Sequence, residues 1–316
     1  MKTRGQHAFV SGELAQRAQQ AIEILGTCEL CPRRCRVDRL AAERGVCGIG
    51  FRARVASYAP HFGEEQPLVG QAGSGTIFFS GCHLHCCFCQ NYGISHDPEA
   101  GVEVDARGLA AIMLELQAMG CHNINFVSPT HIVPQILAAL VLGYENGLNL
   151  PLVYNSSGYE SVSTLELLDG VIDIYMPDFK FWRRSSAANY CEAPDYPETT
   201  RAAVKLMFNQ VGDLALDSTG IAYQGLLIRH LLMPEALEET KQILGYIADQ
   251  ISVNTYVNIM DQYRPCGSSG SFSELENTIG PEHYRQALAI AQSKGLKRLD
   301  QNSLAKLLKQ LGISLG

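Results

Sequence analysis

The chain has 316 residues, of which 46% are hydrophobic and 18% charged, so it can bury a large core and is too apolar to be disordered. Lys and Arg total 25 against 32 Asp and Glu, and this acidic balance disfavours binding to the phosphate backbone of nucleic acids. No apolar run reaches the roughly 18 residues of a membrane span, and the first residues lack a signal-peptide pattern. We therefore expect a cytoplasmic globular protein that binds neither nucleic acid nor membranes.

The first predicted element is an amphipathic helix over residues 11–26. Four cysteines follow it, and we call them the N-terminal quartet: Cys28, Cys31, Cys35 and Cys47. Spacings of two and three residues let one turn present several thiolates to a metal, whereas disulfides are rare in the cytoplasm. Zinc and a [4Fe-4S] cluster fit four thiolates equally well, and free or redox-active thiols are the alternative. We assign residues 1–70 to an N-terminal metal-binding extension and residues 71–316 to the main domain.

A strand-like run over residues 76–80 leads into a loop with a second group of cysteines, which we call the cysteine trio: Cys82, Cys86 and Cys89. Their spacing, C-x3-C-x2-C, allows three thiolates to bind three irons of a [4Fe-4S] cube and leaves the fourth iron open. Electron-transfer clusters normally have four cysteine ligands, so an open iron indicates that a substrate binds there.

Zinc is the alternative at this loop, with His83 or His85 as the fourth ligand. If zinc is not bound, we expect these two histidines to be hydrogen-bonded or solvent-facing loop residues. If the cysteines on either side of Cys87 bind a metal, we expect Cys87 to point away from it. The three solitary cysteines are expected to be buried core residues: Cys121, Cys191 and Cys266.

Downstream of the loop, strand-like runs alternate with helical patterns, which is typical of βα units around a parallel sheet. Five further strands are expected over residues 123–128, 151–155, 172–176, 226–233 and 253–260. Helices are expected over residues 106–119, 131–145, 164–169, 199–210 and 235–250, with a closing helix in the tail from residue 300 to 316. Asp105 and Ser163 are predicted to cap the first and third of these helices.

Polar side chains gather where the predicted strands end. In α/β barrels the active residues lie at the carboxyl ends of the strands, so we expect these side chains to surround one site. They are Ser128, Thr130, Asn155, Asp178, Lys180, Arg229 and His230.

The trio, with Phe88 directly before Cys89, resembles the signature of the radical S-adenosylmethionine (SAM) superfamily. Within it, the strand ends look most like those of the pyruvate formate-lyase activating enzymes, which carry an Asp-x-Lys pair after the fourth strand and a histidine on the fifth. Asp178, Lys180 and His230 match these positions. The alternatives are a surface ion pair between the first two and a hydrogen-bonded core histidine.

The resemblance implies an α/β fold, namely a partial (β/α)6 TIM-like barrel, with a [4Fe-4S] cluster on the trio. It implies an oxidoreductase that reductively cleaves SAM to a 5'-deoxyadenosyl radical, using an electron donor such as flavodoxin or ferredoxin. The radical would abstract a hydrogen atom from a glycine of a partner protein, or from another peptide or a small metabolite. The residues implied to contact SAM are Phe88, Ser128, Thr130, Asn155, Asp178, Lys180 and His230.

Two departures separate the chain from the activating enzymes. Their second strand ends in a Gly-Gly-Glu type motif, whereas residues 127–131 here read Val-Ser-Pro-Thr-His. Backbone carbonyls or Thr130 would then have to bind the methionine amine. The short activating enzymes also lack the N-terminal quartet. A competing interpretation from another class is a zinc-binding structural or interaction protein.

Overall fold

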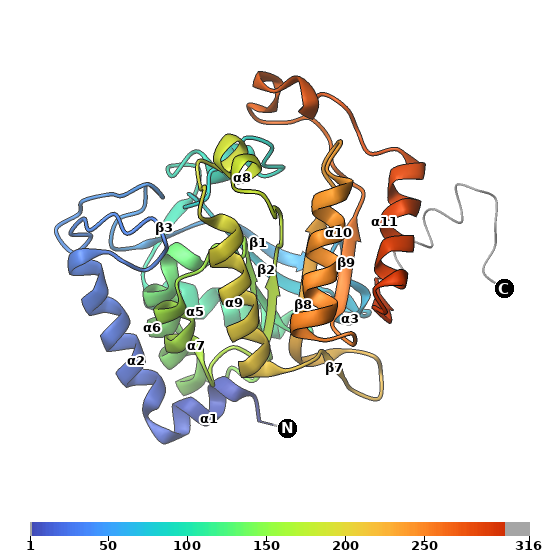
Figure 1. Cartoon of the computed structure of the whole chain (residues 1–316). Helices are drawn as coiled ribbons and strands as arrows, with labels where there is room; N and C mark the ends of the chain where they lie inside the picture. The colour runs from blue at the N-terminus through green and yellow to red at the C-terminus, as the bar shows by residue number, and fades with distance from the viewer. Residues whose placement is uncertain (1, 301–316) are drawn as a thin grey trace.

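The computed structural model describes residues 2–300, and ten strands lie in this part of the chain (Figure 1). They are β1 (Ala53–His61), β2 (Ser74–Phe79), β3 (Val102–Val104), β4 (Ile124–Val127), β5 (Leu152–Ser156), β6 (Ile174–Pro177), β7 (Ala215–Leu216), β8 (Ala222–Leu231), β9 (Tyr256–Met260) and β10 (Arg298–Leu299). Their order in one mixed sheet is β10-β9-β8-β6-β5-β4-β2-β1-β3, with β7 paired to β8. The expected α/β fold is confirmed, and the sheet is open rather than closed.

Strands β2, β4, β5, β6, β8 and β9 are parallel neighbours that follow one another in chain order. They coincide with the six predicted strands, whose positions are therefore confirmed. Such strands are buried on both faces and appear in a sequence as nearly continuous apolar runs. Whether this arrangement is a partial TIM-like barrel stays a prediction.

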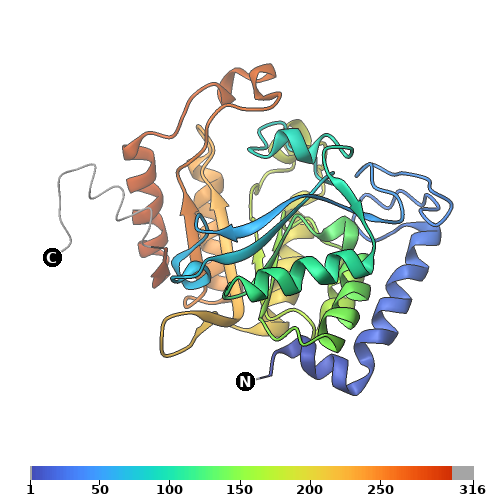
Figure 2. The same ribbon diagram turned by 180° about the vertical axis from the view of Figure 1, so that it is seen from behind.

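The edge formed by β1 and β3 differs from the prediction. Strand β1 runs antiparallel to both β2 and β3 (Figure 2), although its residues were assigned to the N-terminal extension, where no strand was predicted. Its sequence, ARVASYAPH, contains one β-branched residue and a proline, so it carries little of the composition that marks a strand.

The helices are α1 (Arg4–Ser11), α2 (Glu13–Glu23), α3 (Gln66–Val69), α4 (Tyr92–Ser95), α5 (Ala106–Ala118), α6 (Val133–Glu145), α7 (Val162–Leu168), α8 (Arg184–Cys191), α9 (Tyr196–Val211), α10 (Leu237–Tyr246) and α11 (Pro281–Ser293). Short 3-10 or π turns are η1 (Ile24–Thr27), η2 (Thr130–Ile132), η3 (Ile247–Ile251), η4 (Ser269–Ser271) and η5 (Ser273–Leu275). Among residues 2–300, no helix combines the length and apolar character needed to cross a membrane.

The five predicted helices of the main domain are present, and their ends test the predicted caps. Asp105 caps α5, because its Oδ1 accepts a hydrogen bond from the Gly108 N–H at 2.8 Å. The cap predicted at Ser163 is wrong, since α7 begins two residues earlier, after Ser161. The helix predicted over 11–26 is interrupted at Gly12, whose φ of 83° separates α1 from α2. Helices α8 and α11 were not predicted. The closing helix predicted for residues 300–316 lies, apart from its first residue, outside the described part of the chain.

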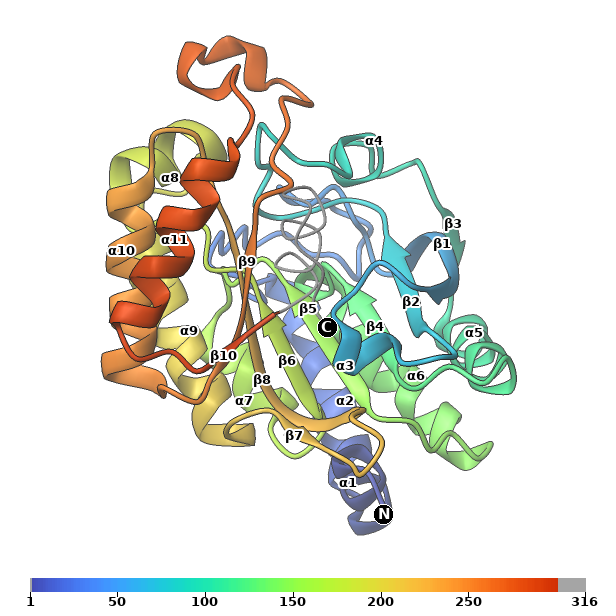
Figure 3. The ribbon, with the colours of Figure 1, turned by 90° about the vertical axis from the view of Figure 1, so that its right-hand side faces the viewer.

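Most of the hydrophobic core lies between the helices and one face of the sheet. Figure 3 shows how α5, α6, α9, α10 and α11 lie around the strands. Helices α1 and α2 contribute to the same core and pack against α6. On the other face of the parallel strands a smaller cluster is closed by Leu68 of α3. The carboxyl ends of the six parallel strands are thereby left together at one edge, where the predicted site residues lie.

Candidate functional site

A cavity of about 410 Å³ lies at the carboxyl ends of the parallel strands. Its volume falls within the range of small-molecule sites, roughly 300–1,000 Å³. Each of the six parallel strands, or the residue that follows it, contributes to the lining: Phe79, Val127, Asn155, Asp178, Arg229 and Met260. Five of the seven side chains expected to surround one site line this cavity, namely Ser128, Asn155, Asp178, Lys180 and Arg229.

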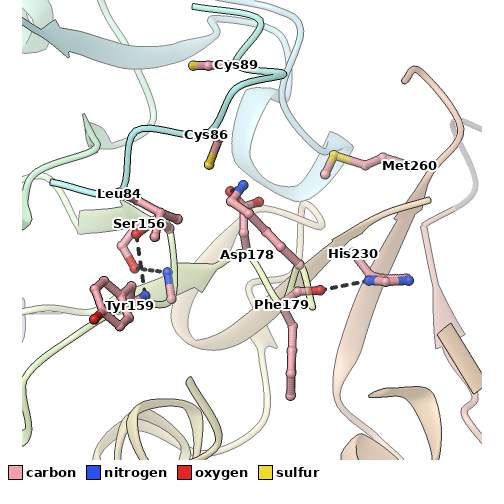
Figure 4. A network of polar contacts seen from close by, with 12 residues as sticks. Leu84, Cys86, Cys89, Ser156, Tyr159, Asp178, Phe179, His230 and Met260 are labelled. Carbon is pink, nitrogen blue, oxygen red and sulfur yellow. Dashed lines mark hydrogen bonds and ion pairs between the residues drawn. The ribbon is translucent and has the colours of Figure 1, made fainter. Parts of the chain in front are cut away.

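All three cysteines of the trio line this cavity, together with Phe88. Figure 4 shows the sulfur of Cys86 directed to the side where Asp178 lies. Cys87 does not line the cavity, as expected, and its N–H donates to the carbonyl of Tyr190 at 2.9 Å. The Phe88 ring packs edge-on against Phe181, with 5.9 Å between ring centroids, and so fixes the loop at its last turn.

The sulfur of each cysteine in the trio accepts a hydrogen bond: Cys82 from the Leu84 N–H at 3.4 Å, Cys86 from the Cys191 thiol at 3.3 Å, and Cys89 from the Ser95 hydroxyl at 3.2 Å. Hydrogen bonds to sulfur suit thiolate ligands. Burial raises the pKa of Cys82 to about 12. The bond from Cys191 and the nearby Lys180 ammonium instead lower the pKa of Cys86, against the effect of burial. The donor set therefore fits a cluster held by three thiolates.

Within residues 2–300, no three His, Cys, Asp or Glu side chains are grouped closely enough to hold one metal ion. A cluster differs from a single ion, because each of its thiolates binds a separate iron and the sulfurs need not converge on a point.

Asp178 and Lys180 form an ion pair at the cavity wall, with 2.6 Å between Oδ2 and Nζ. Burial alone would lower the pKa of Lys180, but the charge and hydrogen bond of Asp178 raise it above its usual value, so the ammonium stays charged. The ion pair that the sequence left as an alternative is thus present, and it faces the cavity rather than open solvent.

Ser128 and Asn155 also line the cavity, as the SAM-contact prediction requires, whereas Thr130 does not. The Thr130 hydroxyl is fully buried and donates to Oε1 of Glu160 at 2.7 Å. Oε2 of Glu160 accepts a hydrogen bond from Tyr154 at 3.1 Å, and burial raises the pKa of this carboxyl to about 7. Thr130 and Glu160 therefore connect the ends of β4 and β5 beneath the cavity.

His230 lies outside this cavity and borders a smaller one of about 190 Å³. Its Nδ1 is 2.7 Å from the Phe179 carbonyl (Figure 4), its Nε2 is 2.9 Å from the Thr240 hydroxyl, and burial lowers its pKa to about 4. This is the hydrogen-bonded core histidine of the alternative interpretation. Side chains alternate along a strand, so the neighbouring Arg229 faces the main cavity instead, where it pairs with Glu64 and Glu65.

The loop histidines are not brought into the cavity either. His83 is buried, its Nε2 lies 2.8 Å from the Tyr159 carbonyl, and its ring stacks on that of Tyr159. His85 lies beside His96, with 5.0 Å between ring centroids. Neither ring lines the cavity, although His85 is hydrogen-bonded to Cys82.

The N-terminal quartet lies on coil between η1 and β1, and none of its sulfurs lines the cavity. Cys28, Cys31 and Cys47 are buried, and burial raises the pKa of Cys31 to about 12. The sulfur of Cys35 accepts a hydrogen bond from the Val46 N–H at 3.4 Å. The quartet is thus a second, separate group of thiols.

Arg33, between two cysteines of the quartet, connects it to the loop of the trio. Its guanidinium donates to four carbonyls: His83 at 2.8 Å, Leu84 at 3.2 Å, Cys191 at 2.8 Å and Glu192 at 2.5 Å. Neither Arg33 nor Cys191 could have been found from spacing, because their partners are 50 or more residues away.

No family model matches the sequence. The chain is 32% identical over 286 residues to the uncharacterized protein MJ0674 of Methanocaldococcus jannaschii, and the match covers 87% of this chain and 77% of that protein. The chain therefore belongs to the same family as MJ0674.

Proposed function

We propose that the protein is a radical SAM enzyme whose [4Fe-4S] cluster is held by Cys82, Cys86 and Cys89. The observation that carries the proposal is that these three cysteines line one cavity at the carboxyl ends of parallel strands, and that the sulfur of each accepts a hydrogen bond. The chain order of the parallel strands supports a partial (β/α)6 barrel as the scaffold.

When bound, the cluster supplies one electron that breaks a carbon–sulfur bond of SAM and so yields methionine and the 5'-deoxyadenosyl radical. The chain's own residues bind and orient SAM. The charged Lys180 suits the carboxylate of its methionine part, and the Asp178 carboxylate can accept hydrogen bonds from ribose hydroxyls. Ser128 and Asn155, at the ends of the neighbouring strands β4 and β5, offer further hydrogen bonds.

The proposal also covers the substrate, the electron donor and the N-terminal quartet. The substrate is a hydrogen donor such as a glycine of a partner protein, another peptide or a small metabolite, and the electron comes from a donor such as flavodoxin or ferredoxin. The quartet would hold a second metal centre. Its four thiols suit another [4Fe-4S] cluster, whose thiolates bind separate irons, and they suit a single zinc ion only if they move closer together than they lie in this structure.

The test uses full-length protein reconstituted with iron and sulfide without oxygen. Wild-type protein should contain about four irons at the trio, absorb broadly near ~400 nm and release 5'-deoxyadenosine when given dithionite and SAM. Cys82→Ala should release no 5'-deoxyadenosine, and relative to wild type it should lose about four irons and the absorption that they cause, whichever metal the quartet holds. Cys121→Ala is the matched control, since this buried thiol belongs to neither cysteine group. A colourless protein that contains only zinc would overturn the proposal in favour of a structural zinc protein.

A further inference from the structure

Cys191, at the last residue of α8, is a fully buried thiol placed against the sulfur of Cys86. The two sulfurs are 3.3 Å apart, and the Cys191 S–H donates. The sequence predicted an inert core residue here. A core role explains the burial but not the direct contact with a member of the trio.

The contact is built by several elements. The N–H of Cys87 donates to the Tyr190 carbonyl at 2.9 Å and so ties the backbone of the trio's loop to the end of α8. Arg33 binds the carbonyls of Cys191 and Glu192 on one side and those of His83 and Leu84 on the other. A guanidinium presents its donors in a rigid fork, so it fixes the helix end relative to the loop.

Cys191 is positioned to donate a hydrogen bond to Cys86 rather than to bind an iron of the cluster as a fourth cysteine ligand. It does not line the cavity, so it does not reach the side where a fourth iron would be open to SAM. Its sulfur touches that of Cys86, whereas the thiolates on different corners of a cube diverge from one another.

We propose that Cys191 sets the reduction potential of the cluster by donating its S–H hydrogen bond to the Cys86 thiolate. This inference rests on the proposed function. Reduction adds one electron to the cluster and places more negative charge on its sulfurs. A hydrogen bond to one of those sulfurs stabilises the reduced state more than the oxidised state. The donor therefore raises the potential and makes the cluster easier to reduce.

The experiment is a redox titration of the reconstituted full-length protein without SAM, followed by electron spin resonance. Cys191→Ala removes the donor, and Cys191→Val removes it while keeping most of the bulk, in case a cavity impairs folding. For both, we expect the ratio of reduced to oxidised cluster at a fixed potential to fall about fivefold, as for the loss of one hydrogen bond. Cys191→Ser keeps a donor, and Cys121→Ala is a buried thiol outside both groups; both should stay within about twofold of wild type.

The outcomes separate the two proposals. A cluster that forms in Cys191→Ala or Cys191→Val and titrates as in wild type overturns the inference alone. An equal shift in Cys121→Ala also overturns it, because a general effect of losing a buried thiol would then explain the change. A wild-type chain that takes up no cluster at the trio overturns the proposed function, and the inference with it.

Discussion

The trio and the N-terminal quartet use the same side chain in different settings. The trio follows β2, an interior strand of the sheet, and its cysteines line a cavity bordered by charged and polar side chains. The quartet lies on coil between η1 and β1, and its sulfurs face no part of that cavity. Cysteine spacing alone predicts metal binding for both groups. Under the proposed function, their positions relative to the strand ends assign the chemistry to the trio and a supporting role to the quartet.

The strongest test of this comparison exchanges one thiol in each group. Cys89→Ser should lose the iron of the trio and all detectable cleavage of SAM, because a cube with two thiolates is not held in place. Cys31→Ser should keep cleavage activity while losing the metal of the quartet. Iron and zinc analysis, with 5'-deoxyadenosine measured by chromatography, checks both. Loss of cleavage in Cys31→Ser with the trio's iron retained would place the quartet in the reaction itself.

A second test concerns the buried carboxyl beneath the cavity. The folded state raises the pKa of Glu160 from 4.5 to about 7, so folding favours its protonated form. Its contribution to stability is full below pH 4.5 and is lost as the pH rises through 7. The free energy of unfolding of wild type should therefore fall by up to about 3 kcal/mol more than that of Glu160→Gln over this interval.

Urea unfolding at several pH values measures this difference. Glu29→Gln is the control in the quartet's region, because Glu29 is an exposed partner of Arg36. Burial also raises the pKa of Asp173 to about 6. Because Asp173 is present in wild type and in both variants, its contribution to the pH dependence of stability cancels from the comparison. Parallel pH curves for wild type and Glu160→Gln would contradict the prediction.

The smallest expected effect probes the connection between the two groups. Arg33→Ala should lower the free energy of unfolding by about 2 kcal/mol, because it leaves several carbonyls around the trio's loop without their donor. Arg36→Ala, three residues along, removes only an exposed ion pair with Glu29 and should change stability by less than about 0.5 kcal/mol. Equal values from denaturant unfolding would mean that Arg33 does not hold the loop.

Much of the scaffold could be predicted from the sequence, because buried parallel strands appear as apolar runs and the cysteine spacing is local. The orientation of β8 could not be predicted. Both of its faces are buried, so alternation does not tell which of Arg229 and His230 faces the cavity. Thr130 was likewise predicted to contact SAM because it lies two residues from Ser128 in the sequence, but only Ser128 lines the cavity.

The unpredicted parts depend on contacts between distant segments. Strand β1 is held by its pairing with β2 and β3 rather than by its composition. Helix α8 reads RSSAANYC, which has no large aliphatic side chain to mark a buried face, yet Cys191 at its end is completely covered through contacts with the trio's loop. Hydrogen bonds that span more than a hundred residues, such as those from Arg33 to the end of α8, leave no local pattern.

The antiparallel pairing of β1 with β2 also affects how the protein can be shortened. Removal of residues 1–70 would delete β1. The N–H and C=O groups on one side of β2 would then have no partners. Such an unprotected strand edge recruits other chains, so the shortened protein should aggregate during expression. A soluble fragment that keeps the parallel strands intact would have to begin before Ala53.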